Sequence, residues 1–130
     1  MDRATILLIE DDVNTRYLLA ERFHRCFQED RILVAESAEA GLELARRTSP
    51  DVVVLDLHLR GMGGFAFAEV LRRAARAPAI VALTGDTRAE TRRQARAAGF
   101  GGFLVKPEGV DSIADVVRQL LGRVRPPDDS

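Results

Sequence analysis

The sequence lacks the residues and segments that mark disulfide-rich, zinc-binding or membrane-spanning proteins. Cys26 is the only cysteine, so no disulfide can form within the chain, and no Cys and His spacing offers a zinc site. The longest apolar runs have four or five residues, as in 79–83, whereas a membrane span needs roughly 20. The first residues, MDRAT, do not form the basic start of a secretory signal. A soluble, cytoplasmic protein is therefore expected.

An excess of charge of either sign is also lacking. Nineteen basic and twenty acidic side chains give a formal net charge of −1 and an isoelectric point near 6.1. This balance provides no global attraction for nucleic acid or an anionic membrane, so neither is an expected partner. Lysine is scarcer still, because Lys106 is the only one and the other eighteen of the nineteen are arginines.

Strand and helix patterns alternate along the chain. Short segments rich in Ile, Val and Leu, without polar alternation, are typical of strands buried on both faces of a parallel sheet. The five predicted strands are 4–10, 32–35, 52–56, 79–84 and 103–106. The five predicted helices, each with a helical period and a polar outer face, are 14–28, 38–48, 64–77, 87–98 and 110–123. This order predicts one α/β domain with a doubly wound parallel sheet and helices on both faces.

The connections contain residues that commonly begin helices, and the end of the chain has a different composition. Ser37 is a predicted N-cap, and Asp12 or Asn14 could cap the first helix. No internal repeat or low-complexity tract interrupts the alternation. We expect the domain to cover 1–124 and the segment 125–130, RPPDDS, to be a flexible tail.

Polar residues stand at the carboxyl ends of the predicted strands, where doubly wound folds bind their ligands. These residues are Glu10, Asp11, Asp12, Asp56, Thr84 and Lys106. Taken singly, most have an ordinary structural interpretation: Asp12 as a helix cap, Thr84 as a turn residue and Lys106 as a surface charge. Asp56 is different, because the glycine-rich segment after it cannot begin a helix at once.

Taken together, these residues predict a site for phosphoryl transfer. Glu10, Asp11 and Asp56 would lie within a few ångströms of one another. At an effective dielectric constant of about 20, two carboxylates about 4 Å apart repel each other by roughly 4 kcal/mol. A single lysine cannot neutralise three carboxylates, whereas Mg²⁺ suits such an oxygen-rich site. Lys106 and Thr84 would stabilise a transferring phosphoryl group, and Asp56 would be the nucleophile that forms an acyl phosphate.

Four motifs resemble those of response-regulator receiver domains of two-component signalling, in particular the chemotaxis type. The motifs are ILLIEDDVNTR (6–16), VVVLDLHLRGMGG (52–64), IVALTG (80–85) and GFLVKP (102–107). The resemblance covers about residues 4–123 and keeps the order and separations usual in the family. It implies a flavodoxin-like fold with sheet order 2-1-3-4-5.

The resemblance also implies a metal and phosphoryl site. Glu10 and Asp11 would be the acidic Mg²⁺-binding pair, and Asp56 would be both the phosphoacceptor and the third carboxylate ligand. The backbone carbonyl of His58 would be a further Mg²⁺ ligand. The domain would not be an enzyme for a separate substrate, but a phosphoacceptor that assists its own phosphorylation and dephosphorylation.

Further residues are implied to carry and tune the response. Thr84 would move onto the phosphoryl oxygens, Lys106 would pair with them, and Phe103 would turn inward as a switch aromatic. His58 and Asp86 occupy positions that tune the lifetime of the phosphoryl group in this family. The Lys106–Pro107 peptide bond is implied to be cis. The surface formed by 87–98, 103–106 and 110–123 would change on phosphorylation.

Two features depart from the usual family pattern. Arg60 stands where the family has proline, which affects the loop geometry and the recognition of the phosphodonor. Gly101 and Gly102 replace more restrictive residues, which favours a looser start to the last strand.

The expected partners follow from the family and from local charge. The phosphodonor would be a sensor histidine kinase or a histidine phosphotransfer protein that docks beside the first helix, and an unidentified protein would receive the output. Basic residues gather near the fourth helix and acidic residues near the fifth: Arg88, Arg92, Arg93 and Arg96, and Glu108, Asp111 and Asp115. Solvated faces account for both clusters, but a phosphorylation-promoted homodimer through these surfaces is a second hypothesis.

Other functional classes fit the sequence less well. A receiver-like interaction module that is never phosphorylated would not need Asp56, Thr84 and Lys106 together. A haloacid-dehalogenase-like phosphatase requires a DxDx[TV] motif after its first strand, which EDDVNT does not supply. A P-loop fits the sequence even less well, because no Lys-Ser or Lys-Thr follows GMGG.

Overall fold

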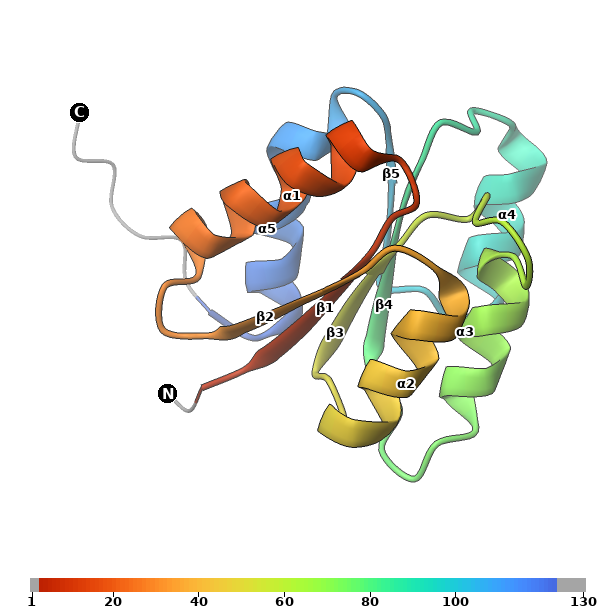
Figure 1. Ribbon diagram of the computed structural model, residues 1–130. Helices are drawn as coiled ribbons and strands as arrows, with labels where there is room; N and C mark the ends of the chain where they lie inside the picture. The colour runs from red at the N-terminus through yellow and green to blue at the C-terminus, as the bar shows by residue number, and fades with distance from the viewer. Residues whose placement is uncertain (1–2, 124–130) are drawn as a thin grey trace.

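A computed structural model describes residues 3–123, and the predicted tail at 125–130 lies outside this range. Strands and helices alternate through it (Figure 1). The strands are β1 (Thr5–Ile9), β2 (Arg31–Ala35), β3 (Val52–Leu55), β4 (Ala79–Thr84) and β5 (Gly102–Val105). The helices are α1 (Val13–Cys26), α2 (Ala38–Thr48), α3 (Gly64–Arg72), α4 (Ala89–Ala97) and α5 (Gly109–Leu120). No helix among these has the length and apolar character needed to cross a membrane.

The strands form one parallel sheet in the order β2-β1-β3-β4-β5. The predicted flavodoxin-like topology is therefore confirmed. In Figure 1, α1 and α5 cover one face of the sheet, and α2, α3 and α4 lie on the other. Because all strands run in the same direction, their carboxyl ends meet at one edge.

Each face of the sheet has its own hydrophobic core. Ile6 and Leu8 of β1 belong to the core with α1 and α5, while the alternate residues Leu7 and Ile9 belong to the core with α2 and α3. Since successive side chains of a strand point to opposite faces, a strand covered on both sides must be apolar throughout. Full burial of each Leu or Ile side chain contributes about 1.5–3 kcal/mol to stability.

The element boundaries differ from the sequence predictions at a few places. The helix predicted over 64–77 ends at Arg72. The chain then turns, and Arg76 donates hydrogen bonds to the Ser49 carbonyl and to Asp51, which directly precedes β3. Pro78 also disfavours a helical conformation at the residue before it. The helix predicted over 87–98 begins at Ala89.

Two predicted caps are confirmed. The Ser37 hydroxyl accepts a hydrogen bond from the Ala40 amide at 3.1 Å at the start of α2. The Asp12 carboxylate accepts one from the Thr15 amide at 2.9 Å at the start of α1. Asp12 is thus consumed as a helix cap, and Glu10 and Asp11 are left as the acidic pair.

Gly101 and Gly102 have a packing role. A Cβ atom on Gly101 would lie 2.8 Å from Leu120 Cδ2, and one on Gly102 would lie 3.0 Å from Val116 Cγ1. Real Cβ contacts are rarely this short, so the two glycines allow α5 to pack directly on the start of β5. This close approach positions β5, and with it the lysine that follows.

Candidate functional site

Parallel pairing brings the polar strand ends together. The residues before Glu10 and Asp56 are paired between β1 and β3, so these two acids follow adjacent strands side by side. On the other flank, the Lys106 amide donates to the Thr84 carbonyl at 2.8 Å, which holds the end of β5 against the end of β4. The sheet itself therefore sets the distances between the site residues.

Lys106 joins two of the carboxylates. Its Nζ lies 2.6 Å from Glu10 Oε1 and 3.0 Å from Asp56 Oδ2. Glu10 is 1% exposed and Asp56 is 8% exposed, so this ammonium lies between two acids that are almost removed from water. The peptide bond from Lys106 to Pro107 is cis, as the family resemblance implied.

Burial and charge change the protonation of these groups. Burial raises the pKa of Glu10 to about 7, although the hydrogen bond from Lys106 acts in the opposite direction. For Lys106, burial lowers the pKa, but the bonds to Glu10 and Asp56 outweigh burial and raise it above its usual value. The lysine is therefore charged near neutral pH, whereas the Glu10 carboxyl is protonated in part of the molecules at that pH.

Three carboxylates fit a hard divalent cation. One ligand atom each from Glu10, Asp11 and Asp56 lies within 4.8 Å of the other two. Carboxylate oxygens are the ligands that Mg²⁺ prefers, and three of them leave room for water and phosphate oxygens. The His58 amide donates to Asp56 Oδ1 at 3.0 Å, which orients the phosphoacceptor candidate. The role of the His58 carbonyl as a ligand stays a prediction.

Thr84 and Phe103 lie at the next two strands. Thr84 is fully buried, and its hydroxyl accepts a hydrogen bond from the Asp86 amide at 3.3 Å. Phe103 is half-buried, and the Arg92 guanidinium of α4 lies 4.7 Å from the centre of its ring. Such a cation–π contact favours the observed position of Phe103. Arg92 was not predicted from the sequence as a partner of this ring.

The two residues predicted to tune phosphoryl lifetime are in contact with each other. His58 Nε2 lies 3.1 Å from Asp86 Oδ2. Asp86 also accepts hydrogen bonds from the Arg88 guanidinium and from the Thr91 hydroxyl, at 2.7 and 2.8 Å. Arg88, followed by Thr91 and His58, lowers the pKa of Asp86 well below its usual range. Because Asp86 is ionised, it can only accept, and His58 Nε2 must donate.

The Asp86 cluster joins three parts of the molecule. His58 comes from the loop between β3 and α3, Arg88 from the loop before α4, and Thr91 from α4 itself. His58 and Asp86 were predicted from the sequence to tune phosphoryl lifetime, whereas Arg88 was noted only as part of the basic cluster and Thr91 was not noted. Arg88 and Thr91 follow Asp86 by two and five residues, a spacing that allows contacts to a residue just before a helix. This spacing is the feature of the sequence from which the two contacts could have been predicted.

Residues 6–118 match the family model of the response regulator receiver domain. The chain belongs to this family. Receiver domains act in two-component signalling, generally as phosphoacceptors rather than as enzymes, and typically bind Mg²⁺ at an acidic pocket like the one formed by Glu10, Asp11 and Asp56.

Similar proteins include a virulence sensor protein, a sensor histidine kinase and a receiver domain of known structure. Virulence sensor protein BvgS of Bordetella pertussis is 29% identical over 94% of this chain and 10% of that protein. Sensor histidine kinase AruS of Pseudomonas aeruginosa is 33% identical over 92% of this chain and 12% of that protein. The chain thus spans about a tenth of these relatives. The structure of the non-phosphorylated HemR receiver domain of Leptospira biflexa is 27% identical, with a TM-score of 0.82 over 97% of this chain and all of that one.

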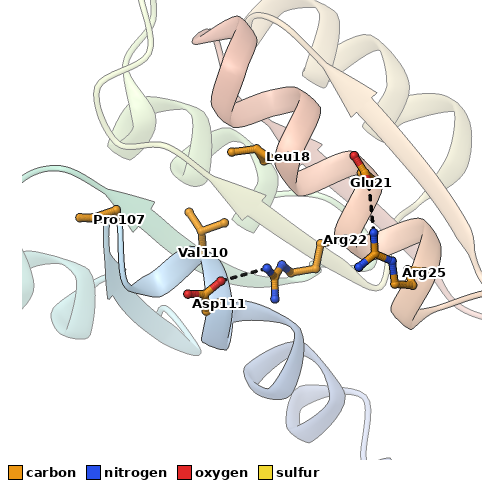
Figure 2. A pocket seen from close by; sticks show the side chains of 7 residues that line it. All are labelled: Leu18, Glu21, Arg22, Arg25, Pro107, Val110 and Asp111. Atoms are coloured by element: carbon orange, nitrogen blue, oxygen red, sulfur yellow. Dashed lines mark hydrogen bonds and ion pairs between the residues drawn. The ribbon is translucent and has the colours of Figure 1, made fainter.

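A groove lies between α1 and α5, and Pro107, the residue that follows Lys106, forms part of its lining (Figure 2). It has a volume of about 400 Å³ and is lined by Leu18, Glu21, Arg22, Arg25, Pro107, Val110 and Asp111. Arg22 Nη2 donates to Asp111 Oδ1 at 2.9 Å across the groove. On the α1 side, Leu18 lines the groove and is 56% exposed, and Val13 and Tyr17 of the same helix are 62% and 69% exposed, so the first half of α1 presents apolar side chains to solvent.

Proposed function

We propose that this receiver takes up a phosphoryl group on Asp56 from the phosphohistidine of a sensor histidine kinase or a histidine phosphotransfer protein. The observation that carries the proposal is the partly buried Lys106 ammonium between the buried carboxylates of Glu10 and Asp56. In the transfer, an Asp56 oxygen forms a bond to phosphorus while the bond from phosphorus to the donor imidazole breaks. The imidazole nitrogen keeps that electron pair and takes up a proton.

The side chains around Asp56 have distinct roles in this proposal. Lys106 offsets the charge on the phosphoryl oxygens, to which it moves from the carboxylates. The His58 amide keeps Asp56 oriented. Glu10, Asp11 and Asp56 would hold Mg²⁺, with the His58 carbonyl as a further ligand, and the bound ion would neutralise part of the phosphoryl charge.

The proposed output is a change in the surface formed by α4, β5 and α5. Thr84 leaves the Asp86 amide for a phosphoryl oxygen, and Phe103 turns into the space that Thr84 vacates. Helix α4 is suited to move, because its buried residues are only Thr91 and Ala95, among those the structure describes, and both are small. An unidentified protein would bind the changed surface.

The α1 side of the groove is the proposed docking site for the phosphodonor. Val13, Tyr17 and Leu18 offer exposed apolar side chains in the first half of α1, the helix that follows the carboxyl end of β1, near which the donor histidine must arrive. Apolar residues exposed in a group commonly mark a protein interface. A donor helix on this surface would bring its histidine to Asp56 without covering α4.

Peptide mapping tests the proposed site of phosphorylation. The protein is incubated with a small phosphodonor and Mg²⁺, treated with borodeuteride to reduce the acyl phosphate, and digested with trypsin. Deuterium should enter residue 56 within the tryptic peptide 48–60, which also contains Asp51 as an internal comparison. Label on another residue, or on none, would refute the proposal.

Loss of the Asp86 carboxylate is expected to shorten the lifetime of the phosphoryl group. In Asp86→Ala, the His58 imidazole loses its acceptor and can turn away, which admits water to phosphorylated Asp56. Dephosphorylation should accelerate by about tenfold, the equivalent of one hydrogen bond of about 1.4 kcal/mol. The rate is measured by the loss of phosphoprotein after the phosphodonor is removed.

A double-mutant cycle controls for this effect. If His58 and Asp86 act through their mutual contact, His58→Ala should give a similar rate, and the double variant should add little to either change. Independent, additive effects of the two substitutions would show that the contact does not set the lifetime.

A homodimer through α4, β5 and α5 is a further part of the proposal. Asp111 and Asp115 bind Arg22 and Arg118 of their own chain, so the arginines of a partner's α4 must compete with these contacts. We expect sedimentation velocity to show dimers only with beryllofluoride, a phosphoryl mimic, and to show their dissociation at rising salt because exposed ion pairs are screened. A monomer under every condition would contradict this part.

A further inference from the structure

We infer that Arg16 and the backbone N–H of Arg60 together position Asp11 for a divalent cation. The inference rests on the proposed function, since it concerns the Mg²⁺ site beside Asp56. It assigns positioning roles to two residues, one on α1 and one in the loop between β3 and α3. Neither residue is part of the acidic cluster itself.

Arg16 holds the main chain that carries the acidic pair. Its Nη1 lies 3.0 Å from the Glu10 carbonyl oxygen and 3.3 Å from the Asp11 carbonyl oxygen. The side chain is 21% exposed, and its Nη2 is 3.9 Å from Glu36. Because the guanidinium donates to carbonyl groups, it fixes the backbone after β1 without using a carboxylate oxygen that a cation needs.

Arg60 contacts the Asp11 side chain through its main chain. Its backbone N–H donates to Asp11 Oδ2 at 3.3 Å, although the two residues are 49 positions apart. This bond exists because residue 60 has a backbone N–H, which a proline would lack. The departure from the family's proline therefore supplies a direct link from the loop after Asp56 to a metal-binding carboxylate.

Asp11 depends on this link more than its two neighbours do. Glu10 and Asp56 are oriented by the Lys106 ammonium, whereas within residues 3–123 no ion pair is recorded for Asp11. Asp11 is also less buried than Glu10 and Asp56. A partly exposed carboxylate without a cationic partner would sample several orientations, and the Arg60 N–H selects one of them.

Isothermal titration of the metal-free protein with MgCl₂ tests the inference without reference to phosphorylation. Arg60→Pro removes the N–H and the side chain and also fixes the backbone φ of residue 60; it is expected to weaken Mg²⁺ binding by about tenfold, as is typical when a group that orients a metal ligand is lost. Arg60→Ala keeps the N–H and should bind like wild type. Equal affinities of Arg60→Pro and Arg60→Ala would overturn the role of the N–H.

Two further variants keep the test decisive if Arg60→Pro disturbs the loop more widely. Arg16→Met keeps an unbranched apolar stem but has no N–H donor for the two carbonyl groups, so its Mg²⁺ affinity should also fall, and wild-type affinity would overturn the role of Arg16. Arg60→Pro added to Asp11→Asn should cause no further loss, whereas an additive loss would mean that the N–H acts elsewhere. If Asp11→Asn itself binds like wild type, the proposed metal site fails together with the inference.

Discussion

Lys106→Met is expected to slow phosphoryl transfer to Asp56 by about 100- to 1,000-fold, the usual effect of removing one preorganised donor from a reacting oxyanion. Methionine keeps the length of the stem but has no ammonium. The variant therefore loses the charge that now lies 3.0 Å from Asp56 and 2.6 Å from Glu10 and that would move to the phosphoryl group. The rate is measured as phosphoprotein formed from a small phosphodonor at saturating Mg²⁺.

Lys106→Arg separates charge from shape. Arginine restores a cation, but its planar fork favours two-point binding and cannot pass from carboxylate to phosphoryl oxygen as a compact ammonium can. We expect it to recover part of the transfer rate while coupling poorly to Phe103, as read from the ring signals of Phe103 with beryllofluoride. Wild-type transfer in Lys106→Met would remove the lysine from the reaction.

Mg²⁺ affinity is expected to fall by about tenfold for each pH unit below about 7, because the proton on Glu10 must leave before the cation binds. Burial of Glu10 raises its pKa to about 7, so the proton competes with the metal in the neutral range. Above this pKa the affinity should level off. Calorimetric titrations from about pH 8 to about pH 5 measure the slope.

Glu10→Gln provides the control for this pH dependence. The variant has no titrating group at this position, so its weaker Mg²⁺ binding should lose the slope that Glu10 causes. Glu10 should also cause a pH dependence of stability in the metal-free protein. This dependence has the opposite sign, because stability falls as pH rises whereas Mg²⁺ affinity increases. The contribution of Glu10 to stability is complete below its ordinary pKa of 4.5 and is lost as pH rises through about 7, and Glu10→Gln should abolish this loss. If Mg²⁺ affinity in Glu10→Gln still fell with pH as it does in wild type, the pH dependence could not be assigned to Glu10.

The arrangement of strands was predictable because burial on both faces leaves a simple signature. Segments such as 52–55 are apolar at every position, and helices with polar outer faces separate them. The end of α3 was not predictable from periodicity, since 73–77 continues a helical pattern while Arg76 is drawn to Asp51 and the Ser49 carbonyl. The roles of Gly101 and Gly102 depend on the approach of α5, which no local pattern encodes.

For the site, the sequence identified the residues that end strands but not those that hold them. Glu10, Asp56 and Lys106 are brought together by sheet order alone. Arg16 acts through main-chain carbonyl groups, and Arg60 acts through its own amide, so neither contact depends on side-chain chemistry that a motif would record. Backbone contacts of this kind become visible only when the loops are placed.

Intact mass after incubation with a small phosphodonor and Mg²⁺ tests the central claim, phosphorylation of Asp56, most directly. Wild-type protein should gain the mass of one phosphoryl group, and Asp56→Asn, which keeps the shape of the side chain but removes the nucleophilic carboxylate, should gain none. Equal gain in both proteins would place the reaction elsewhere. No gain in wild type would identify the chain as a receiver that acts without phosphorylation.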